Sequence, residues 1–388
     1  MSPSDQIPVT SLYVHVPFCA RKCEYCAFYS EAASGEVVNR YVECLVREMQ
    51  LAARELNPKT IFFGGGTPSL LNLHQWERIL VAMSDARLLG AEEWTVECNP
   101  ATVSLDKARL LRSAGVNRVS MGVQSLDEAL LDRLGRVHSR EMVFRSFDLL
   151  RQAGFENLNL DLMFAIPGQT REIWQRTLTE ALALGSEHLS CYEVIYEEDT
   201  ALFAQLEAGE FEVDDDLACD MFEMLLEEAD RGGFKQYEVA NFARGAFLEE
   251  GGIPARACRH NVNYWRGGDF HGLGPSATSY VRGERTRNWA NTRLYCEQLE
   301  RGAKPIESRE SLNPLARAGE KAAFGLRMNA GWPFLEFVQR TGFDLRQEWQ
   351  TDMTTLVHQG FGEMDALGFR LTPRGLRFAD FAAEQFLR

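Results

Sequence analysis

Three cysteines near the N-terminus have a spacing that suits a metal cluster. Cys19, Cys23 and Cys26 follow the pattern C-x3-C-x2-C within the segment P-F-C-A-R-K-C-E-Y-C-A-F, residues 17–28. Thiolates select iron–sulfur clusters, zinc or copper(I). A structural zinc site needs four protein ligands, and Phe28 stands where a fourth cysteine could follow Cys26. We therefore expect a [4Fe–4S] cluster with one iron open to a small molecule, rather than three buried thiols that are close by chance.

Further polar residues stand where the expected strands end. The glycine run 64–68, G-G-G-T-P, would let backbone groups approach a ligand closely. Glu97 and Gln124 each end an expected strand, and the Arg136 guanidinium could bind a carboxylate through two hydrogen bonds. Asp161 lies among apolar residues, where an acid without a partner is costly. The alternative for each is an ordinary turn or a solvated surface side chain.

A third candidate set is the pattern H-N-x-x-Y-W in the second half of the chain. Its residues are His260, Asn261, Tyr264 and Trp265. A histidine can ligate heme iron, and aromatic rings can stack on a porphyrin. Cys258 and His271 are nearby alternatives as iron ligands. The alternative for the whole set is a hydrogen-bonded structural histidine with core aromatics.

The elements that must position these residues alternate between strand and helix over the first 200 residues. Apolar alternation predicts strands at 12–16, 60–64, 94–98, 117–123, 157–164 and 188–195, and amphipathic patterns predict helices at 37–56, 73–88, 104–114, 141–154 and 172–185. Such alternation implies a parallel α/β sheet. Six units are fewer than the eight of a closed TIM barrel, and periodicity alone also allows a doubly wound sheet. Polar motifs at the carboxyl ends of strands favour a barrel.

The pattern changes after about residue 240. A loop at 245–252 is followed by expected helices at 313–328, 332–341 and 345–359, a hairpin at 361–365 and 369–372, and a last helix at 373–386. Helices followed by a hairpin resemble a winged-helix domain. We therefore predict two domains, 1–242 and 243–388, with the second acting as a packing or substrate-covering module.

Composition limits the partners and the compartment. The 388 residues carry a net charge of −15, which argues against nucleic acid and against anionic membrane surfaces. We see no apolar run long enough to span a membrane and no secretory signal. Nine cysteines, three of them in the cluster pattern, make a disulfide framework improbable, so we expect a cytoplasmic protein.

The cysteine pattern resembles the signature of the radical S-adenosylmethionine (SAM) superfamily. In that superfamily SAM chelates the open iron through its amino and carboxylate groups. The G-G-G-T-P run is similar to the superfamily loop that holds the SAM amino group. The resemblance implies an open barrel of six βα units, a partial (β/α)6 TIM-type barrel.

Within the superfamily, the chain resembles the oxygen-independent coproporphyrinogen III dehydrogenases (HemN) and their relatives. This resemblance implies that cluster-bound SAM is contacted by Tyr13, Gly65 and Glu97. It also implies a neighbouring site, where the dehydrogenase holds a second SAM, lined by Tyr25, Gly66, Thr67, Gln124, Arg136 and Asp161.

Two features separate this chain from the dehydrogenases. Phe28 replaces their fourth cysteine, and H-N-x-x-Y-W resembles the hallmark of their paralogues, the HemW heme chaperones. The resemblance implies a protein that binds heme and passes it to apo-hemoproteins, with respiratory enzymes as one candidate class and a homodimer as one candidate assembly. It names no catalytic residue and leaves open whether SAM is cleaved. The alternatives are a dehydrogenase that decarboxylates coproporphyrinogen III, a radical enzyme with another substrate, and a structural zinc protein.

Overall fold

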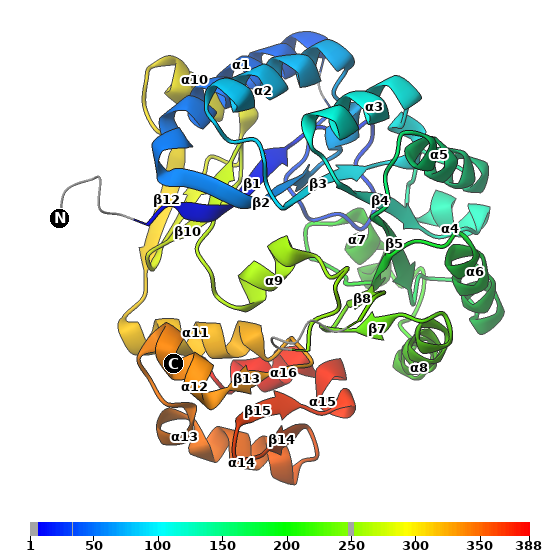
Figure 1. Ribbon diagram of the computed structural model, residues 1–388. Helices are drawn as coiled ribbons and strands as arrows, with labels where there is room; N and C mark the ends of the chain where they lie inside the picture. Colours follow the sequence, from blue (N-terminus) through cyan, green and yellow to red (C-terminus); the bar gives the residue numbers. More distant parts are fainter. Residues whose placement is uncertain (1–6, 33, 247–251) are drawn as a thin grey trace.

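An open barrel of mainly parallel strands forms the larger part of the molecule (Figure 1). The structure is a computed structural model and describes residues 7–32, 34–246 and 252–388. Its first six strands are parallel and adjacent in chain order. They are β1 (Val9–Val16), β2 (Leu56–Gly65), β3 (Glu93–Cys98), β4 (Arg118–Gln124), β5 (Leu158–Phe164) and β6 (His188–Glu193). These strands confirm the expected partial barrel. The expected loop at 245–252 lies mostly outside the described residues.

Helices cover the outer face of these strands (Figure 1). The longer ones are α1 (Gly35–Ala52), α2 (Leu73–Asp85), α3 (Leu105–Ala114), α5 (Arg140–Gln152), α6 (Arg171–Ala183) and α8 (Asp215–Arg231), with short helices α4 (Glu128–Arg133) and α7 (Ala201–Glu207). Single 3-10 turns are η2 (Ala53–Glu55), η3 (Pro68–Leu70) and η4 (Pro100–Thr102). The start of α2 shows how local sequence sets a boundary, because the side chains of Asn72 and Gln75 each accept the other's backbone N–H at 2.9 Å.

Alternation along each strand divides the apolar core from a polar barrel interior. In β1, Leu12 and Val14 belong to the core beneath the helices. The intervening Tyr13 and His15 are hydrogen-bonded to each other on the opposite face. The same alternation turns the polar residues of the other strands inward. The barrel therefore presents hydrogen-bonding groups to its interior while the helices close its outside.

Three short strands extend the sheet beyond the six that the sequence predicts. Strands β7 (Lys235–Gln236) and β8 (Asn241–Ala243) are added beside β6, and β9 (His271–Leu273) pairs in parallel with β1 at the other edge. Strands of two or three residues show too little alternation to be recognised in a sequence. Helix α9 (Arg259–Trp265) lies within the ring of strands (Figure 1).

The second half of the chain contributes to both ends of the molecule. A sheet of β10 (Thr278–Val281), β11 (Glu284–Asn288) and β12 (Ile306–Ser311), with α10 (Thr292–Glu300), lies beside α1 and β9. Side chains of α10, including Tyr295 and Leu299, belong to the same core as the barrel strands. The last elements form a separate core that includes Trp332, Phe337 and Trp349.

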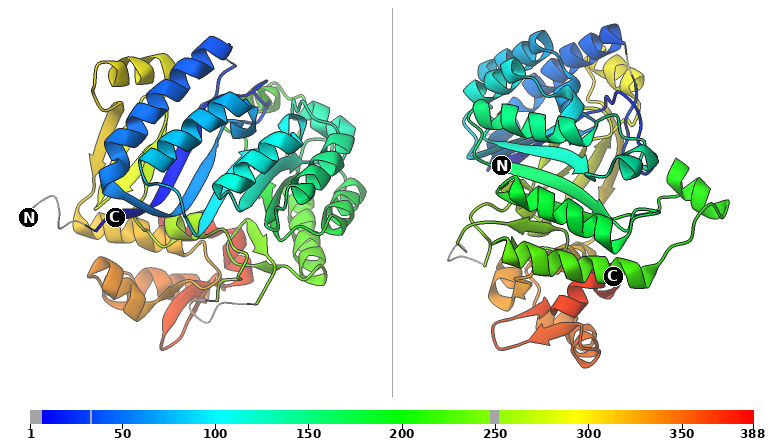
Figure 2. Two further views of the ribbon diagram at one scale, coloured as in Figure 1. Left: turned by 45° about the horizontal axis from the view of Figure 1, so that its top comes forward. Right: turned by 90° about the vertical axis from the view of Figure 1, so that its right-hand side faces the viewer.

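These last elements lie together at one end of the molecule (orange to red in Figure 2). They are α11 (Pro314–Gly325), β13 (Trp332–Pro333), α12 (Phe334–Thr341), α13 (Leu345–Glu348), α14 (Gln350–His358), β14 (Gly362–Met364), β15 (Gly368–Leu371), α15 (Pro373–Arg377) and α16 (Ala379–Glu384). The expected hairpin and winged-helix-like arrangement are present. Two expected helices are each divided, at Trp349 and at Phe378, and the buried Trp349 indole donates to the Phe386 carbonyl at 3.0 Å.

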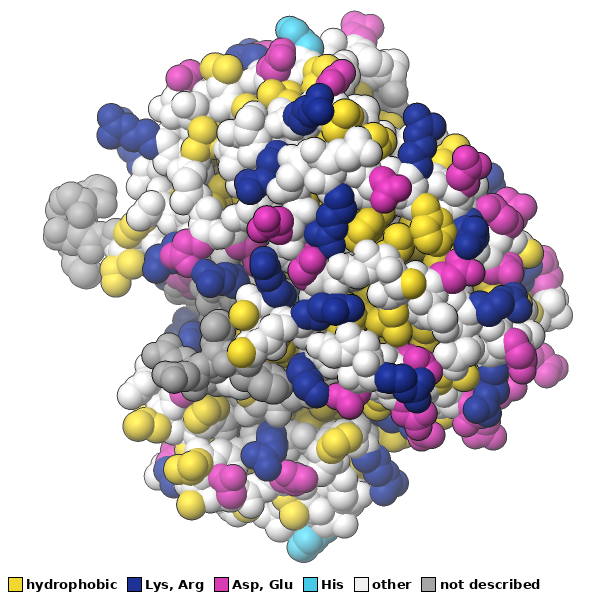
Figure 3. Space-filling model, turned by 45° about the vertical axis from the view of Figure 1, so that its right-hand side comes forward, with side chains coloured by type: hydrophobic (Ala, Val, Ile, Leu, Met, Phe, Trp, Pro, Cys, Tyr) yellow, Lys and Arg dark blue, Asp and Glu magenta, His cyan; other side chains and the backbone are white. Residues whose placement is uncertain are grey.

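The surface matches an acidic but mixed charge pattern. On the face drawn in Figure 3, basic and acidic side chains are intermingled rather than gathered into a basic stripe. Among the described residues, no helix combines the length and the apolar character needed to cross a membrane.

Candidate functional site

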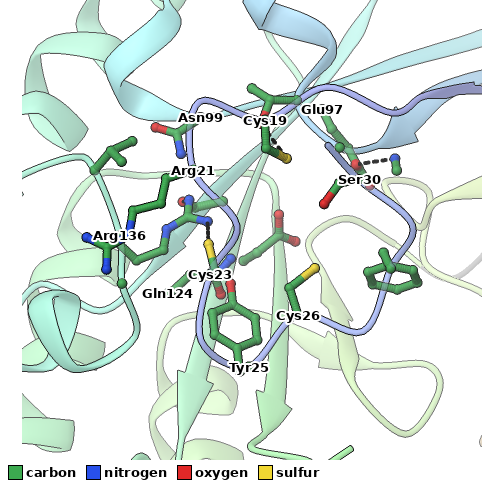
Figure 4. Close-up of a pocket in the computed structure, with 18 of the residues that line it drawn as sticks. Cys19, Arg21, Cys23, Tyr25, Cys26, Ser30, Glu97, Asn99, Gln124 and Arg136 are labelled. Atoms are coloured by element: carbon green, nitrogen blue, oxygen red, sulfur yellow. Dashed lines mark hydrogen bonds between the residues drawn. The ribbon is translucent and has the colours of Figure 1, made fainter. Parts of the chain in front are cut away.

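A cavity of about 650 Å³ opens at the carboxyl ends of the barrel strands. Its walls include the three cysteines and nearly all of the residues that the sequence proposes for SAM. The predicted residues that line it are Cys19, Cys23, Cys26, Tyr25, Gly65, Gly66, Thr67, Glu97, Gln124, Arg136 and Asp161. They come from segments spread over nearly 150 residues, and Figure 4 shows many of them around one open space. The barrel therefore brings the two predicted sets together.

The cysteine loop joins the end of β1 to α1 and is closed at its base. The Cys19 N–H donates to the Glu31 carbonyl at 3.1 Å, and the Glu31 N–H donates to the Pro17 carbonyl at 2.7 Å. Within the loop, the Cys26 N–H donates to the Cys23 carbonyl at 3.2 Å. All three thiols are free and face the cavity (Figure 4). Burial raises the pKa of the Cys26 thiol, and the neighbouring cysteines raise it further.

The glycine run at the end of β2 packs directly against the start of the cysteine loop. The Gly66 N–H donates to the Val16 carbonyl and the Thr67 N–H donates to the Phe18 carbonyl, both at 2.8 Å. A Cβ atom on Gly66 would lie 2.6 Å from the Val16 carbonyl oxygen, which no side chain tolerates. The Thr67 hydroxyl donates to the Cys19 sulfur at 3.6 Å. Glycine here allows the two loops to touch.

Arg136 places a positive charge beside the thiols. Its Nη1 donates to the Cys23 sulfur at 3.4 Å, and its Nη2 donates to the Gly122 carbonyl at 2.6 Å. Burial opposes a high pKa for Arg136, but Tyr25 and Cys23 raise its pKa above the usual value. The guanidinium therefore stays charged and favours thiolates or a ligand carboxylate next to it.

Gln124 is aimed into the cavity by an irregular strand end. Its backbone has φ of 66°, a conformation that non-glycine residues rarely adopt. The pairing of β4 with β5 shifts register between Gly122 and Gln124. Strained residues of this kind persist where the surrounding structure holds them and cluster at functional sites. The bulge therefore supports a binding role for the Gln124 amide.

Two half-buried acids, Glu97 and Asp161, form the inner wall. Burial raises the pKa of Glu97 to about 8, and the nearby Asp161 carboxyl adds to the effect, although Glu97 accepts the Gly65 N–H at 3.1 Å. Burial also raises the pKa of Asp161, against hydrogen bonds from Asn159 at 2.7 Å and from Ser120. A cationic amino group bound beside Glu97 and Asp161 would lower their pKa values, because it stabilises the ionised carboxylates.

Tyr13 is the predicted SAM residue that does not line the cavity. Its hydroxyl is hydrogen-bonded to His15 Nδ1 at 2.9 Å, and burial followed by the nearby Glu97 raises the pKa of Tyr13. His15 Nε2 lies 2.9 Å from the Tyr29 carbonyl in the cysteine loop. Burial lowers the pKa of His15 to about 4, so this ring is neutral. Direct contact between Tyr13 and SAM stays a prediction.

The H-N-x-x-Y-W helix, α9, lies near the opposite, amino-terminal ends of the strands. The His260 side chain is buried, with Nδ1 3.0 Å from the hydroxyls of both Ser11 and Thr60 and Nε2 2.7 Å from the Tyr264 hydroxyl. Burial lowers the pKa of His260 to about 3. The Glu93 carboxylate accepts the His260 N–H at 3.0 Å and fixes the start of the helix. In this arrangement both ring nitrogens of His260 are engaged.

The other members of this set surround the same helix. Trp265 packs near Phe324 and lies under the Arg327 guanidinium, 5.2 Å from the ring centre, while Asn261 is half-buried. Burial raises the pKa of Cys258 to about 12, which keeps it a thiol, and His271 lies 3.5 Å from Glu55. Since this set does not line the cysteine cavity, its contact with heme stays a prediction.

Several cavity residues were not identified from the sequence. They are Arg21, Ser30, Asn99, Met163 and Tyr192. Alternation could have found Met163 and Tyr192, because each follows by two positions an inward-facing residue of its strand. Arg21, Ser30 and Asn99 lie in loops, whose side-chain directions no periodicity predicts.

Comparisons with known proteins agree with this fold. A sequence profile of the radical SAM superfamily matches residues 13–181, and one of the HemN C-terminal domain matches residues 312–378. The heme chaperone HemW of Lactococcus lactis is 32% identical over 97% of both chains. That of Escherichia coli is 33% identical over 98% of this chain and 99% of its own. The solved structure of E. coli coproporphyrinogen III oxidase (HemN), a radical SAM enzyme, superposes with a TM-score of 0.83 at 21% identity, covering 98% of this chain and 90% of that chain.

Proposed function

Because this chain belongs to the HemW family within the radical SAM superfamily, we propose that it is a heme chaperone that carries a [4Fe–4S] cluster and exchangeable SAM. The observation that carries the proposal is that relatives named heme chaperones are 32% and 33% identical to this chain over 97% and 98% of its length. The cysteine cavity supports the cofactor part of the proposal.

The donor set in the cavity fits an iron–sulfur cluster. Cys19, Cys23 and Cys26 are free thiols on one short loop that face a common space. Arg136 provides a cation beside them, which favours the thiolate form that binds metal. When bound, the cluster would supply one iron without a protein ligand, at which SAM can be held.

The residues around the cysteines fit SAM. Glu97 suits an amino group, because its carboxyl accepts the Gly65 N–H through one oxygen and has further acceptor capacity for a donor from the ligand. Arg136 and Gln124 offer donors for a carboxylate or for ribose hydroxyls. Tyr25, Gly66, Thr67 and Asp161 would complete the site from the cysteine loop, the glycine run and β5.

The partners that follow from this function are heme and acceptor apo-hemoproteins. The names of the relatives, heme chaperones, support heme as a ligand. The acceptor proteins and a homodimer are further parts of the proposal. A cytoplasmic location is also part of the proposal, supported by nine cysteines that are all free. The predicted second domain, residues 243–388, would act as a packing or substrate-covering module, and its last part has a core and a hairpin of its own.

Anaerobic titration with hemin tests the proposal. Protein verified by metal, sulfide and SAM analysis to hold both cofactors is titrated while the heme absorbance is followed. A heat-denatured sample measures the nonspecific adsorption of heme. We expect saturation at about one heme per chain. Absence of saturable binding would contradict the chaperone function.

A second candidate is oxidative decarboxylation of coproporphyrinogen III. Tyr25, Gln124, Arg136 and Asp161 surround the space next to the cysteines, as the HemN resemblance implies for a second SAM site. Phe28, which replaces a fourth cysteine, weighs against it. The test is anaerobic incubation with SAM, a reductant and coproporphyrinogen III, with products read by mass spectrometry. We expect no decarboxylated tetrapyrrole; loss of two carboxyl groups over repeated turnovers would replace the chaperone by an enzyme.

A further inference from the structure

Four exposed apolar side chains line the cysteine cavity near its mouth. Phe28 is 70% exposed, Ile195 is 66% exposed, and Tyr192 and Val137 are each 42% exposed, yet all four line the cavity. They come from the cysteine loop, from the turn after α4, and from the end of β6 and the segment beyond it. We refer to these four residues as the apolar rim. Gathered apolar groups left in water are typical of binding surfaces.

The apolar rim does not match what SAM and a cluster require. The groups that suit a SAM amino group, carboxylate or ribose are on Glu97, Arg136 and Gln124. The rim offers instead aliphatic and aromatic faces, with the Tyr192 hydroxyl as its one side-chain polar group. The adenine ring of SAM needs one flat apolar contact, which Tyr25 and Met163 in the same cavity can supply, so the rim side chains are left for another ligand. A second, flatter and more apolar ligand fits the rim better.

The charges around the rim are asymmetric. Arg21 lines the cavity on the cysteine-loop side, and its contact with Glu24 at 3.3 Å is solvent-exposed and therefore weak. Glu193 and Glu197 line the cavity on the β6 side. A ligand carboxylate would thus be attracted towards Arg21 and repelled from the other side. The rim selects a flat apolar ligand with carboxylates along one edge.

We propose that the heme of the chaperone function lies across this mouth, with one porphyrin face on Phe28 and Ile195 and its propionates towards Arg21. The inference rests on the proposed function and adds a place for its ligand. Phe28 contributes an aromatic face where the dehydrogenase pattern has a cysteine. It is also the most exposed apolar side chain of the rim. Heme would then cover the cluster cavity while it is bound.

Hemin titration of rim variants, with both cofactors verified, tests the place of binding. The double variant Phe28→Ser with Ile195→Ser should bind heme about tenfold more weakly or worse, because two large apolar contacts are lost. The matched control is Leu335→Ser with Leu367→Ser, which are 70% and 79% exposed and do not line the cavity. This control should bind heme as the unmodified protein does.

Two further arms keep the test decisive. The single variant Ile195→Ser changes a residue outside the cysteine loop. It therefore tests the rim site even if the double variant loses its cluster. Arg21→Ala should weaken binding of heme but not of heme dimethyl ester, in which the propionates carry no charge. Unchanged heme affinity in the Ile195 and Arg21 variants, or an equal loss in the control, would overturn the rim site and leave the chaperone function standing. If the unmodified protein does not bind heme, the proposed function itself is wrong.

Discussion

At the scale of single residues, the cavity combines soft ligands with a controlled set of charges. Three thiols share the cavity with the half-buried Arg136 guanidinium and with the inner-wall acids Glu97 and Asp161, whose pKa values burial raises. The arginine favours thiolates, while Glu97, whose pKa burial raises to about 8, can remain neutral until a cation arrives. A neutral Glu97 avoids placing a further negative charge beside Asp161 and beside the proposed cluster, which would bring negative charge of its own.

Removal of the cysteines tests the cluster assignment. The variant with Cys19, Cys23 and Cys26 all changed to alanine should lose the broad visible absorbance of the cluster together with its iron and sulfide. The matched control is Cys219→Ala, because Cys219 is a partly exposed cysteine on α8 outside the cavity. Iron and sulfide retained in the triple variant would rule out this assignment.

Substitution of His260 tests whether the α9 histidine has a structural role. In His260→Ala, the hydroxyls of Ser11, Thr60 and Tyr264 lose their shared partner, and a buried cavity opens. We expect the free energy of unfolding to fall by about 2–4 kcal/mol in urea titrations. The exposed His74 provides the control, since His74→Ala should change stability little. A stable His260→Ala protein that no longer binds heme would instead favour direct heme contact by this helix.

At the scale of elements, short loops at the strand ends position the three cysteines. The cysteine loop is positioned by the glycine run of β2 and closed by the Pro17–Glu31 pairing, so its shape depends on backbone contacts rather than on side-chain packing. This explains why the glycine run could be recognised from its composition, whereas its contacts with Val16 and Phe18 could not.

Gly66→Ala tests this contact between loops. The added methyl group would meet the Val16 and Phe18 carbonyls and push the cysteine loop away. We expect far-UV circular dichroism close to that of the unmodified protein, but cluster content after reconstitution reduced severalfold. Gly35→Ala, at the open start of α1, is the control. Full cluster content in Gly66→Ala would show that the close approach is not needed.

Glu48 ties α1 to the elements of the second half of the chain and should make stability depend on pH. Its carboxylate accepts hydrogen bonds from the Gly274 N–H, the Asn288 amide and the Tyr295 hydroxyl, all at 2.7 Å. Burial nevertheless raises the pKa of Glu48 from 4.5 to about 7, with the three hydrogen bonds opposing the shift. Between these values the folded chain holds one more proton than the unfolded chain, so stability falls as pH rises.

The expected loss from this group is about 3 kcal/mol between pH values below 4.5 and above 7. Urea titrations at about pH 5 and pH 8 should show a smaller decrease in Glu48→Gln than in the unmodified protein, because glutamine has no proton to lose in this range. The same decrease in both proteins would mean that Glu48 does not titrate between these pH values.

The sequence predicted the long elements and the cavity more fully than the connections. Strands β1–β6 and their helices have strong periodicity, and the cysteine, glycine and strand-end motifs were recognisable one by one. The edge strands β7–β9 were too short to recognise. The position of α9 inside the barrel depends on hydrogen bonds to Ser11, Thr60 and Glu93, which lie more than 160 residues away. Local patterns cannot predict such contacts.

At the scale of the whole molecule, the two ends of the barrel differ in character. The carboxyl ends hold an open cavity with the proposed cofactor ligands and an apolar rim, whereas α9, with a neutral and hydrogen-bonded histidine, lies at the amino ends. Under the proposed function, ligand exchange would take place at the open end. A chaperone needs one open site from which its cargo can leave.

Heme transfer tests the central claim most directly. Protein holding cluster, SAM and one heme is mixed anaerobically with increasing amounts of a heme-free b-type cytochrome, and the rate at which the cytochrome spectrum forms is measured. Direct transfer predicts a rate that rises with cytochrome concentration above the rate of heme release measured alone with a heme-scavenging protein. A rate that equals passive release at every cytochrome concentration would contradict a chaperone function.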